Sequence, residues 1–183
     1  MNIPNLLTAS RIALLPLFLY LLIDGRLEMA AVFFLIGSAS DALDGFIARR
    51  FNQVTELGKR LDPLADKLFI LSSFTALYLI GMLPLWLLII SFIKEIVILG
   101  GSALIQHKKK ALHIEPTFAG KTCTAFQMLT VLLILLNEMG YITGELLLAV
   151  MMVTAILLLC STWSYIVAGV NQYKGKKGGT AID

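Results

Sequence analysis

The stretch Leu146–Val170, LLLAVMMVTAILLLCSTWSYIVAGV, contains no charged residue. A helix needs about 20 mainly apolar residues to cross the hydrocarbon core of a bilayer, so this stretch predicts a transmembrane helix. The whole chain agrees with that prediction, because 58% of its 183 residues are hydrophobic and 15% are charged. In typical soluble domains about 45–50% of the residues are apolar and about 25% are charged, so an ordinary soluble domain is excluded.

Five further apolar stretches precede this one and are separated by polar or glycine-containing turns. The second and third stretches reach membrane-spanning length only if their helices continue through aspartates. We therefore expect an all-α integral membrane protein with six transmembrane helices in one domain over residues 1–173. A disordered basic tail is expected over residues 174–183. The predicted spans cover residues 6–23, 27–48, 62–80, 84–106, 118–136 and 146–170.

The basic residues are distributed unevenly between the two sides that six helices would define. Arg26 is the basic residue predicted on one side. The side that carries both termini has Arg49, Arg50, Lys59, Arg60, Lys67, Lys108, Lys109, Lys110, Lys121, Lys174, Lys176 and Lys177. Cytoplasmic loops are enriched in Lys and Arg, so both termini are expected in the cytoplasm.

Four aspartates lie near the cytoplasmic ends of the second and third predicted spans. Asp41 and Asp44 share one helical face at i, i+3, and Asp62 and Asp66 share another at i, i+4. Four carboxylates that converge in an apolar environment cannot all stay ionised unless cations lie between them. Ligands that are all oxygen favour Mg²⁺ or Mn²⁺, and two such ions can bind a diphosphate. We therefore expect a two-metal site with an active site near the cytoplasmic membrane interface.

Three neighbouring residues suit the approach of a phosphate ligand. Gly45 and Gly58 have no side chain to obstruct a ligand next to these helices. Arg49 can pair with a phosphate oxygen. An intramembrane acidic cluster also occurs in ion and proton transporters, which form the alternative class. Transport gives Gly45 and Arg49 no role, and a polyprenyl transferase, which also binds diphosphate through acidic pairs, does not suit a single contiguous motif.

The motif Asp41-x-x-Asp44-Gly45-x-x-Ala48-Arg49, continued by Gly58-x-x-x-Asp62-x-x-x-Asp66, resembles the signature of the CDP-alcohol phosphotransferases. Members of that family are six-helix membrane enzymes, usually homodimers. They transfer a substituted phosphoryl group from a CDP-alcohol to a second alcohol and release CMP. The resemblance, with the orientation above, implies the bacterial inner membrane, lipid surroundings and no nucleic-acid partner.

The resemblance also implies a role for each matching residue. Asp41, Asp44, Asp62 and Asp66 would bind two Mg²⁺ or Mn²⁺ ions, and Asp66 would also act as the catalytic base on the acceptor hydroxyl. The CDP site would consist of Asn5, Thr8, Gly45, Ala48, Arg49 and Gly58.

Within the family, the chain is most similar to the phosphatidylglycerophosphate synthases, over residues 2–11, 55–67 and 120–127. This similarity implies transfer from CDP-diacylglycerol to sn-glycerol 3-phosphate. The fourth span departs from that pattern, because Lys94-Glu95 replaces Arg-Glu and Ser102 replaces a second Arg. Residues 115–122 also resemble cardiolipin synthases, whose acceptor is phosphatidylglycerol, and this remains the alternative acceptor.

Lys94 is a cation within the fourth predicted span and requires an anionic partner. Glu95 projects about 100° away on a helix, so we expect Lys94 to face another group. That group would be the acceptor phosphate, with Lys121 and either Lys59 or Arg60 as further ligands, or an acid on a neighbouring helix.

Overall fold

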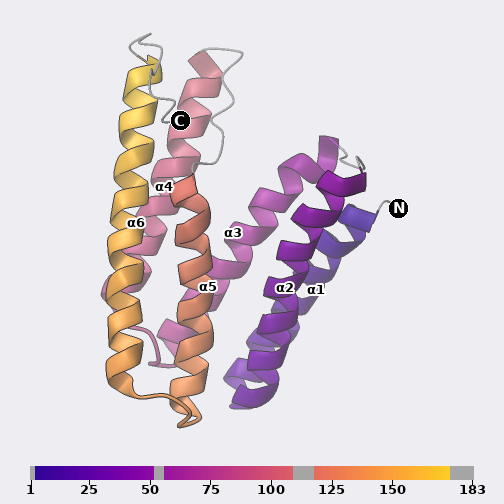
Figure 1. Ribbon diagram of the computed structural model, residues 1–183, viewed down its shortest axis with the longest axis vertical. Helices are drawn as coiled ribbons and strands as arrows, with labels where there is room; N and C mark the ends of the chain where they lie inside the picture. The colour runs from indigo at the N-terminus through magenta and orange to yellow at the C-terminus, as the bar shows by residue number, and fades with distance from the viewer. Residues whose placement is uncertain (1–2, 52–55, 109–117, 174–183) are drawn as a thin grey trace.

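The computed structural model describes residues 3–51, 56–108 and 118–173, and the side chains of 13–39, 65–101, 120 and 122–170. These residues form six helices and no strand. The helices are α1 (Ile3–Ile23), α2 (Leu27–Phe51), α3 (Glu56–Leu79), α4 (Leu85–Lys108), α5 (Phe118–Glu138) and α6 (Gly144–Tyr173). They run alternately up and down along the long axis of the molecule (Figure 1). The predicted all-helical fold with six helices is confirmed.

Helices α2 and α3 confirm that the short apolar stretches continue through the aspartates. α2 includes Asp41 and Asp44, and α3 includes Asp62 and Asp66. Each helix extends beyond its predicted span at one end or at both, because polar residues next to an apolar stretch can continue its backbone hydrogen-bond pattern. The predicted tail at 174–183 lies outside the described residues.

Helices α1, α3 and α5 end in the same kind of turn. Gly25, Gly81 and Gly140 have positive φ angles of 77°, 82° and 79°. In each turn the next residue's amide reaches back five positions, as in Arg26 N to Leu21 O at 2.9 Å. This Schellman pattern satisfies helix-end carbonyl groups and suits glycine, which has no Cβ to clash at positive φ. The three turns lie at one end of the molecule, where α1, α3 and α5 reverse direction (Figure 1).

The helices pack as two groups of three. α1 lies against both α2 and α3, whereas α6 lies against both α4 and α5. Between the groups, α3 contacts α4 and α5, and α2 contacts α5. Figure 1 shows the groups diverging toward the end that carries the N-terminus. Residues of the α1–α3 group and of the α4–α6 group therefore meet mainly along α3 and α5.

Three aromatic rings join the helices of the first group. Phe34 of α2 lies 5.4 Å from Phe18 of α1 and 5.5 Å from Phe69 of α3 between ring centroids. Phe69 is 1% exposed, and its ring packs against the α2 backbone at Gly37. A Cβ atom at Gly37 would lie 3.0 Å from Phe69 Cζ, so the glycine permits this close approach. Gly37 and Phe69 lie about one turn from Asp41 and Asp66, respectively.

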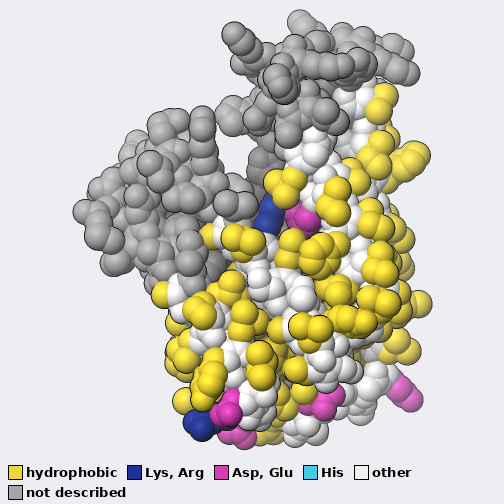
Figure 2. All heavy atoms as spheres, turned by 180° about the vertical axis from the view of Figure 1, so that it is seen from behind, with side chains coloured by type: hydrophobic (Ala, Val, Ile, Leu, Met, Phe, Trp, Pro, Cys, Tyr) yellow, Lys and Arg dark blue, Asp and Glu magenta, His cyan; other side chains and the backbone are white. Residues whose placement is uncertain are grey.

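The flank of the molecule is apolar, and the described charged groups gather mostly at the end formed by the three turns (Figure 2). Large apolar side chains are exposed on the described helices, including Ile96, Leu148, Ile156 and Trp163. Among the described residues, Gly144–Val170 meets the length and hydropathy of a transmembrane helix. Shorter apolar helical stretches cover Ala13–Ile23, Leu27–Ala39 and Thr122–Glu138.

The close contact at Gly37 predicts that Gly37→Ala lowers the free energy of unfolding. Overpacking costs about 1–3 kcal/mol, which outweighs the gain of about 0.5–1 kcal/mol from alanine in a helix. The matched control is Gly100→Ala in α4, where an added Cβ meets nothing within 4 Å. Thermal unfolding of the detergent-purified variants measures both changes. Equal stability of the two variants would contradict the packing described here.

Candidate active site

The four aspartates of the predicted metal site lie on two helices of the same group. Asp41 and Asp44 lie in α2, three residues apart, and Asp62 and Asp66 lie in α3, four residues apart. Continuous helix through both pairs puts each pair on one helical face. Asp66 is the member whose side chain is described, and it is half-buried. The backbone thus supports the two acidic faces, while their convergence stays a prediction.

The ligands of the predicted metal site are all carboxylate oxygens of aspartates. Carboxylate oxygens without imidazole or thiolate suit hard divalent cations. Among the described residues, no three His, Cys, Asp or Glu side chains form a metal-binding group. Asp41, Asp44 and Asp62 lie outside the described side chains, so the metal site stays a prediction.

The predicted CDP-binding residues lie on α1 and on the two helices that carry the aspartates. Their helical backbone is described and their side chains are not. Asn5 and Thr8 lie in α1, Gly45, Ala48 and Arg49 in α2, and Gly58 in α3. Of the candidate acceptor ligands, Lys59 and Arg60 lie in α3 and Lys121 in α5, also without described side chains. Lys94, in α4, is the acceptor candidate whose contacts are described.

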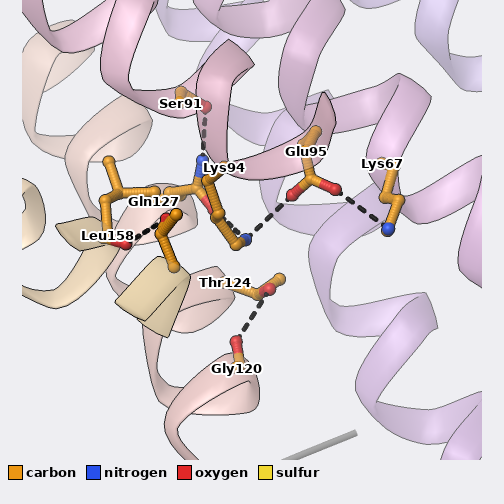
Figure 3. A network of polar contacts seen from close by, with 9 residues as sticks. Lys67, Ser91, Lys94, Glu95, Gly120, Thr124, Gln127 and Leu158 are labelled. Carbon is orange, nitrogen blue, oxygen red and sulfur yellow. Dashed lines mark hydrogen bonds and ion pairs between the residues drawn. The ribbon is translucent and has the colours of Figure 1, made fainter. Parts of the chain in front are cut away.

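A buried polar network surrounds Lys94 and connects α3, α4 and α5 (Figure 3). The Lys94 ammonium donates to Glu95 Oε1 at 2.8 Å and to Gln127 Oε1 at 3.3 Å. Gln127 Nε2 donates in turn to Ser91 Oγ at 2.7 Å. On the other side, Lys67 Nζ forms an ion pair with Glu95 Oε2 at 3.0 Å. Each oxygen of the Glu95 carboxylate thus contacts a different ammonium group.

The contact between Lys94 and Glu95 corrects one prediction. The angular separation of about 100° between adjacent helical residues was expected to keep Glu95 away from Lys94. The long, flexible lysine stem instead carries the ammonium back to the adjacent carboxylate. Lys94 is 3% exposed, so its charge is matched inside the protein by an acid of its own helix. The role of Lys94 in acceptor binding remains a proposal.

Three partners in this network were not predicted from the sequence, namely Lys67, Gln127 and Ser91. A signal for Lys67 was available, because it directly follows Asp66 in a helix that also crosses apolar surroundings. Intramembrane charges usually pair with one another, so Glu95 and Lys67 were candidates for an ion pair. Two ammonium groups against one carboxylate leave the Lys67–Glu95–Lys94 set with one positive charge.

The sequence model of the CDP-alcohol phosphatidyltransferases matches residues 1–167. The chain belongs to this family. The predicted resemblance is therefore confirmed, and the chain is a phosphatidyltransferase. The CDP-alcohol phosphatidyltransferase family is membrane-associated and generally depends on divalent metals. Its members transfer a phosphatidyl group, so the match supports neither the transporter nor the polyprenyl transferase alternative.

Individual members of the family are similar over most of their length. A CDP-diacylglycerol–glycerol-3-phosphate 3-phosphatidyltransferase of Aquifex aeolicus is 36% identical over 167 residues, covering 89% of this chain and 92% of the relative. The enzyme of the same name from Bacillus subtilis is 32% identical over 155 residues, covering 76% of this chain and 79% of the relative. A CMP-forming cardiolipin synthase of Streptomyces coelicolor is 35% identical over 151 residues, covering 75% of this chain and 66% of the relative. The similar proteins thus include both of the expected acceptor specificities.

Proposed function

We propose that this phosphatidyltransferase uses CDP-diacylglycerol and sn-glycerol 3-phosphate and releases phosphatidylglycerophosphate and CMP. The observation that carries the choice of acceptor is the similarity to the Aquifex aeolicus enzyme over 92% of that relative's length. The excess positive charge of the Lys67–Glu95–Lys94 set also suits the phosphate monoester of glycerol 3-phosphate, which carries more negative charge than the phosphodiester of phosphatidylglycerol. Cardiolipin synthesis is the second candidate, favoured by the 35% identity to the Streptomyces coelicolor enzyme.

The α1–α3 group holds the donor in this proposal. Asp41, Asp44, Asp62 and Asp66 would hold two Mg²⁺ or Mn²⁺ ions, which when bound neutralise the negative charge of the diphosphate. Arg49 pairs with a phosphate oxygen, and Gly45, Ala48 and Gly58 leave room for the nucleotide. Asn5 and Thr8 of α1 complete the CDP site.

The chemical step in this proposal is a displacement at the phosphorus atom that carries the diacylglycerol. Asp66 accepts the proton of the acceptor hydroxyl as its oxygen forms a bond to that phosphorus. The bond between this phosphorus and the oxygen that bridges to the CMP phosphate breaks, and CMP departs with the bonding electrons. Lys94, with Lys121 and Lys59 or Arg60, binds the phosphate of glycerol 3-phosphate and orients its free hydroxyl.

The six helices are proposed to span the bacterial inner membrane with both termini in the cytoplasm. The apolar flank supports contact with lipid, because exposed apolar side chains surround the helices (Figure 2). Of the Lys and Arg residues in the described part of the chain, Arg26 is the one at the end formed by the three turns, and this supports an outward-facing end, since Lys and Arg favour the cytoplasmic side. The enzyme is proposed to function as a homodimer, as members of the CDP-alcohol phosphotransferase family usually do.

The acceptor is tested by product identification. Purified protein receives labelled CDP-diacylglycerol and, in separate reactions, glycerol 3-phosphate, phosphatidylglycerol, inositol phosphate or serine. The expected lipid product is phosphatidylglycerophosphate, formed with an equal amount of CMP from the glycerol 3-phosphate reaction. Formation of cardiolipin from phosphatidylglycerol, with no product from glycerol 3-phosphate, would replace the first candidate by the second.

Metal removal is expected to abolish CMP release, because four neighbouring carboxylates require cations to remain ionised beside a diphosphate. EDTA should stop the reaction, and added Mg²⁺ or Mn²⁺ should restore it. Asp41→Asn, Asp44→Asn and Asp62→Asn each remove one ligand charge and should lower turnover by orders of magnitude. Asp24→Asn, at the opposite end, is the control with unchanged turnover. Normal rates in chelator would contradict the two-metal proposal.

Lys94→Met is expected to raise the KM for glycerol 3-phosphate by about tenfold or more, as expected for loss of a charge-assisted contact. The KM for CDP-diacylglycerol should change little. The variant is expected to fold, because Glu95 keeps Lys67 as its counter-ion. Steady-state kinetics with each substrate varied in turn make the measurement. An equal change in both KM values would assign Lys94 a structural role.

A further inference from the structure

The Lys67–Glu95 ion pair crosses the boundary between the two helix groups. Lys67 lies in α3 of the first group, and Glu95 lies in α4 of the second. Their charged atoms are 3.0 Å apart, and Glu95 is buried. Through its other oxygen, Glu95 also holds Lys94 at 2.8 Å. One carboxylate therefore fixes a side chain of each group at the same point (Figure 3).

In the proposed reaction the donor site lies within the first group, whereas the acceptor site takes residues from both groups, with Lys59 or Arg60 in α3. All predicted CDP and metal ligands belong to α1, α2 and α3. Two of the acceptor candidates, Lys94 in α4 and Lys121 in α5, belong to the other group. Transfer requires the acceptor hydroxyl to lie near both Asp66 and the donor phosphorus, so the relative position of the groups sets the reaction geometry.

Lys67 transmits this position directly to the predicted catalytic base. It follows Asp66 in the same helical turn, so an ammonium held against α4 also restrains the backbone that carries Asp66. On the other side of the same carboxylate, Lys94 is restrained in addition by Gln127 of α5. Lys94 is thus in direct contact with Glu95, and Asp66 is connected to Glu95 through the adjacent residue Lys67.

We propose that Glu95 is a positioning residue that sets the distance between Asp66 and the acceptor bound at Lys94, an inference that rests on the proposed function. It touches neither substrate and acts through Lys67 on one side and Lys94 on the other. Substitution of Glu95, or loss of its ion pair with Lys67, lowers kcat/KM for the acceptor. Donor binding stays intact, because the donor site lies wholly within α1–α3.

The sharpest test breaks the connection between the groups and retains the pair within α4. Lys67→Met removes the Lys67–Glu95 ion pair and leaves Glu95 with Lys94 as counter-ion. The expected result is a fall in kcat/KM for the acceptor of about tenfold or more, with the KM for CDP-diacylglycerol within about twofold of wild type. Lys67→Arg keeps a cation that can reach the carboxylate and should recover most of the loss.

A double-mutant cycle separates positioning through Lys67 from other effects. If Glu95 acts through Lys67, adding Glu95→Gln to Lys67→Met costs less than Glu95→Gln costs alone. Glu138→Gln, an exposed acid at the end of α5, is the matched control and should leave all constants unchanged. If Lys67→Met does not accumulate in membranes, Lys67→Gln replaces it, because the amide keeps a donor for Glu95.

With active wild-type protein, three outcomes overturn the inference. The first is an unchanged kcat/KM for the acceptor in the Lys67 variants. The second is an equal loss of kcat/KM for donor and acceptor, which indicates a structural role. The third is full additivity of the two substitutions in the double-mutant cycle. Wild-type protein that transfers to none of the acceptors overturns the proposed function and this inference with it, whereas active wild type with an unaltered Lys67 variant overturns this inference alone.

Discussion

The carboxylate of Glu95, shared between two ammonium groups, is the interaction on which the arrangement of the helices depends. An isolated charge in apolar surroundings is costly, and breaking a buried ion pair by removing one partner typically costs about 3–5 kcal/mol. Lys94 and Glu95 are both buried, so their charges require partners within the protein. Because Lys67 belongs to α3, this requirement links α3 to α4 and brings the two groups into register.

Several other polar side chains form hydrogen bonds within their own helices. The hydroxyls of Ser73, Thr75 and Thr162 each donate to the backbone carbonyl four residues earlier, at 2.7 Å in all three cases. Such local bonds let a polar residue occupy an apolar environment without a partner on another helix. Thr130 and Thr154 also contact each other across α5 and α6 at 2.8 Å. The polar contacts between helices are thus concentrated at a few points, of which the Lys67–Glu95–Lys94 set is the charged one among the described residues.

The number of helices and most of their bounds could be predicted from the sequence, because apolar stretches and glycine turns are local features. The extension of α2 through Asp41 and Asp44 was predictable for a related reason, since the apolar part alone is too short. The partners of Glu95 were not predictable in the same way. They depend on the rotation of α3 against α4 and on the rotamer of a flexible lysine, which are set by packing between helices and not by spacing along the chain. The four carboxylates were identified by their spacing, yet their mutual distances depend on contacts such as the one between Gly37 and Phe69.

The turns at Gly25, Gly81 and Gly140 divide the chain into three helical hairpins, and this has a consequence for biosynthesis. The middle hairpin, α3 with α4, contains Lys67, Lys94 and Glu95 together. As a nascent chain leaves the ribosome, the two arms can therefore form the Lys67–Glu95 ion pair before α5 is made, while Lys94 pairs with Glu95 within α4. The most polar part of the molecule would then enter an apolar phase already partly neutralised, and Gln127 would join the completed set when the last hairpin arrives. The order of the hairpins along the chain thus protects the segment that would be hardest to integrate alone.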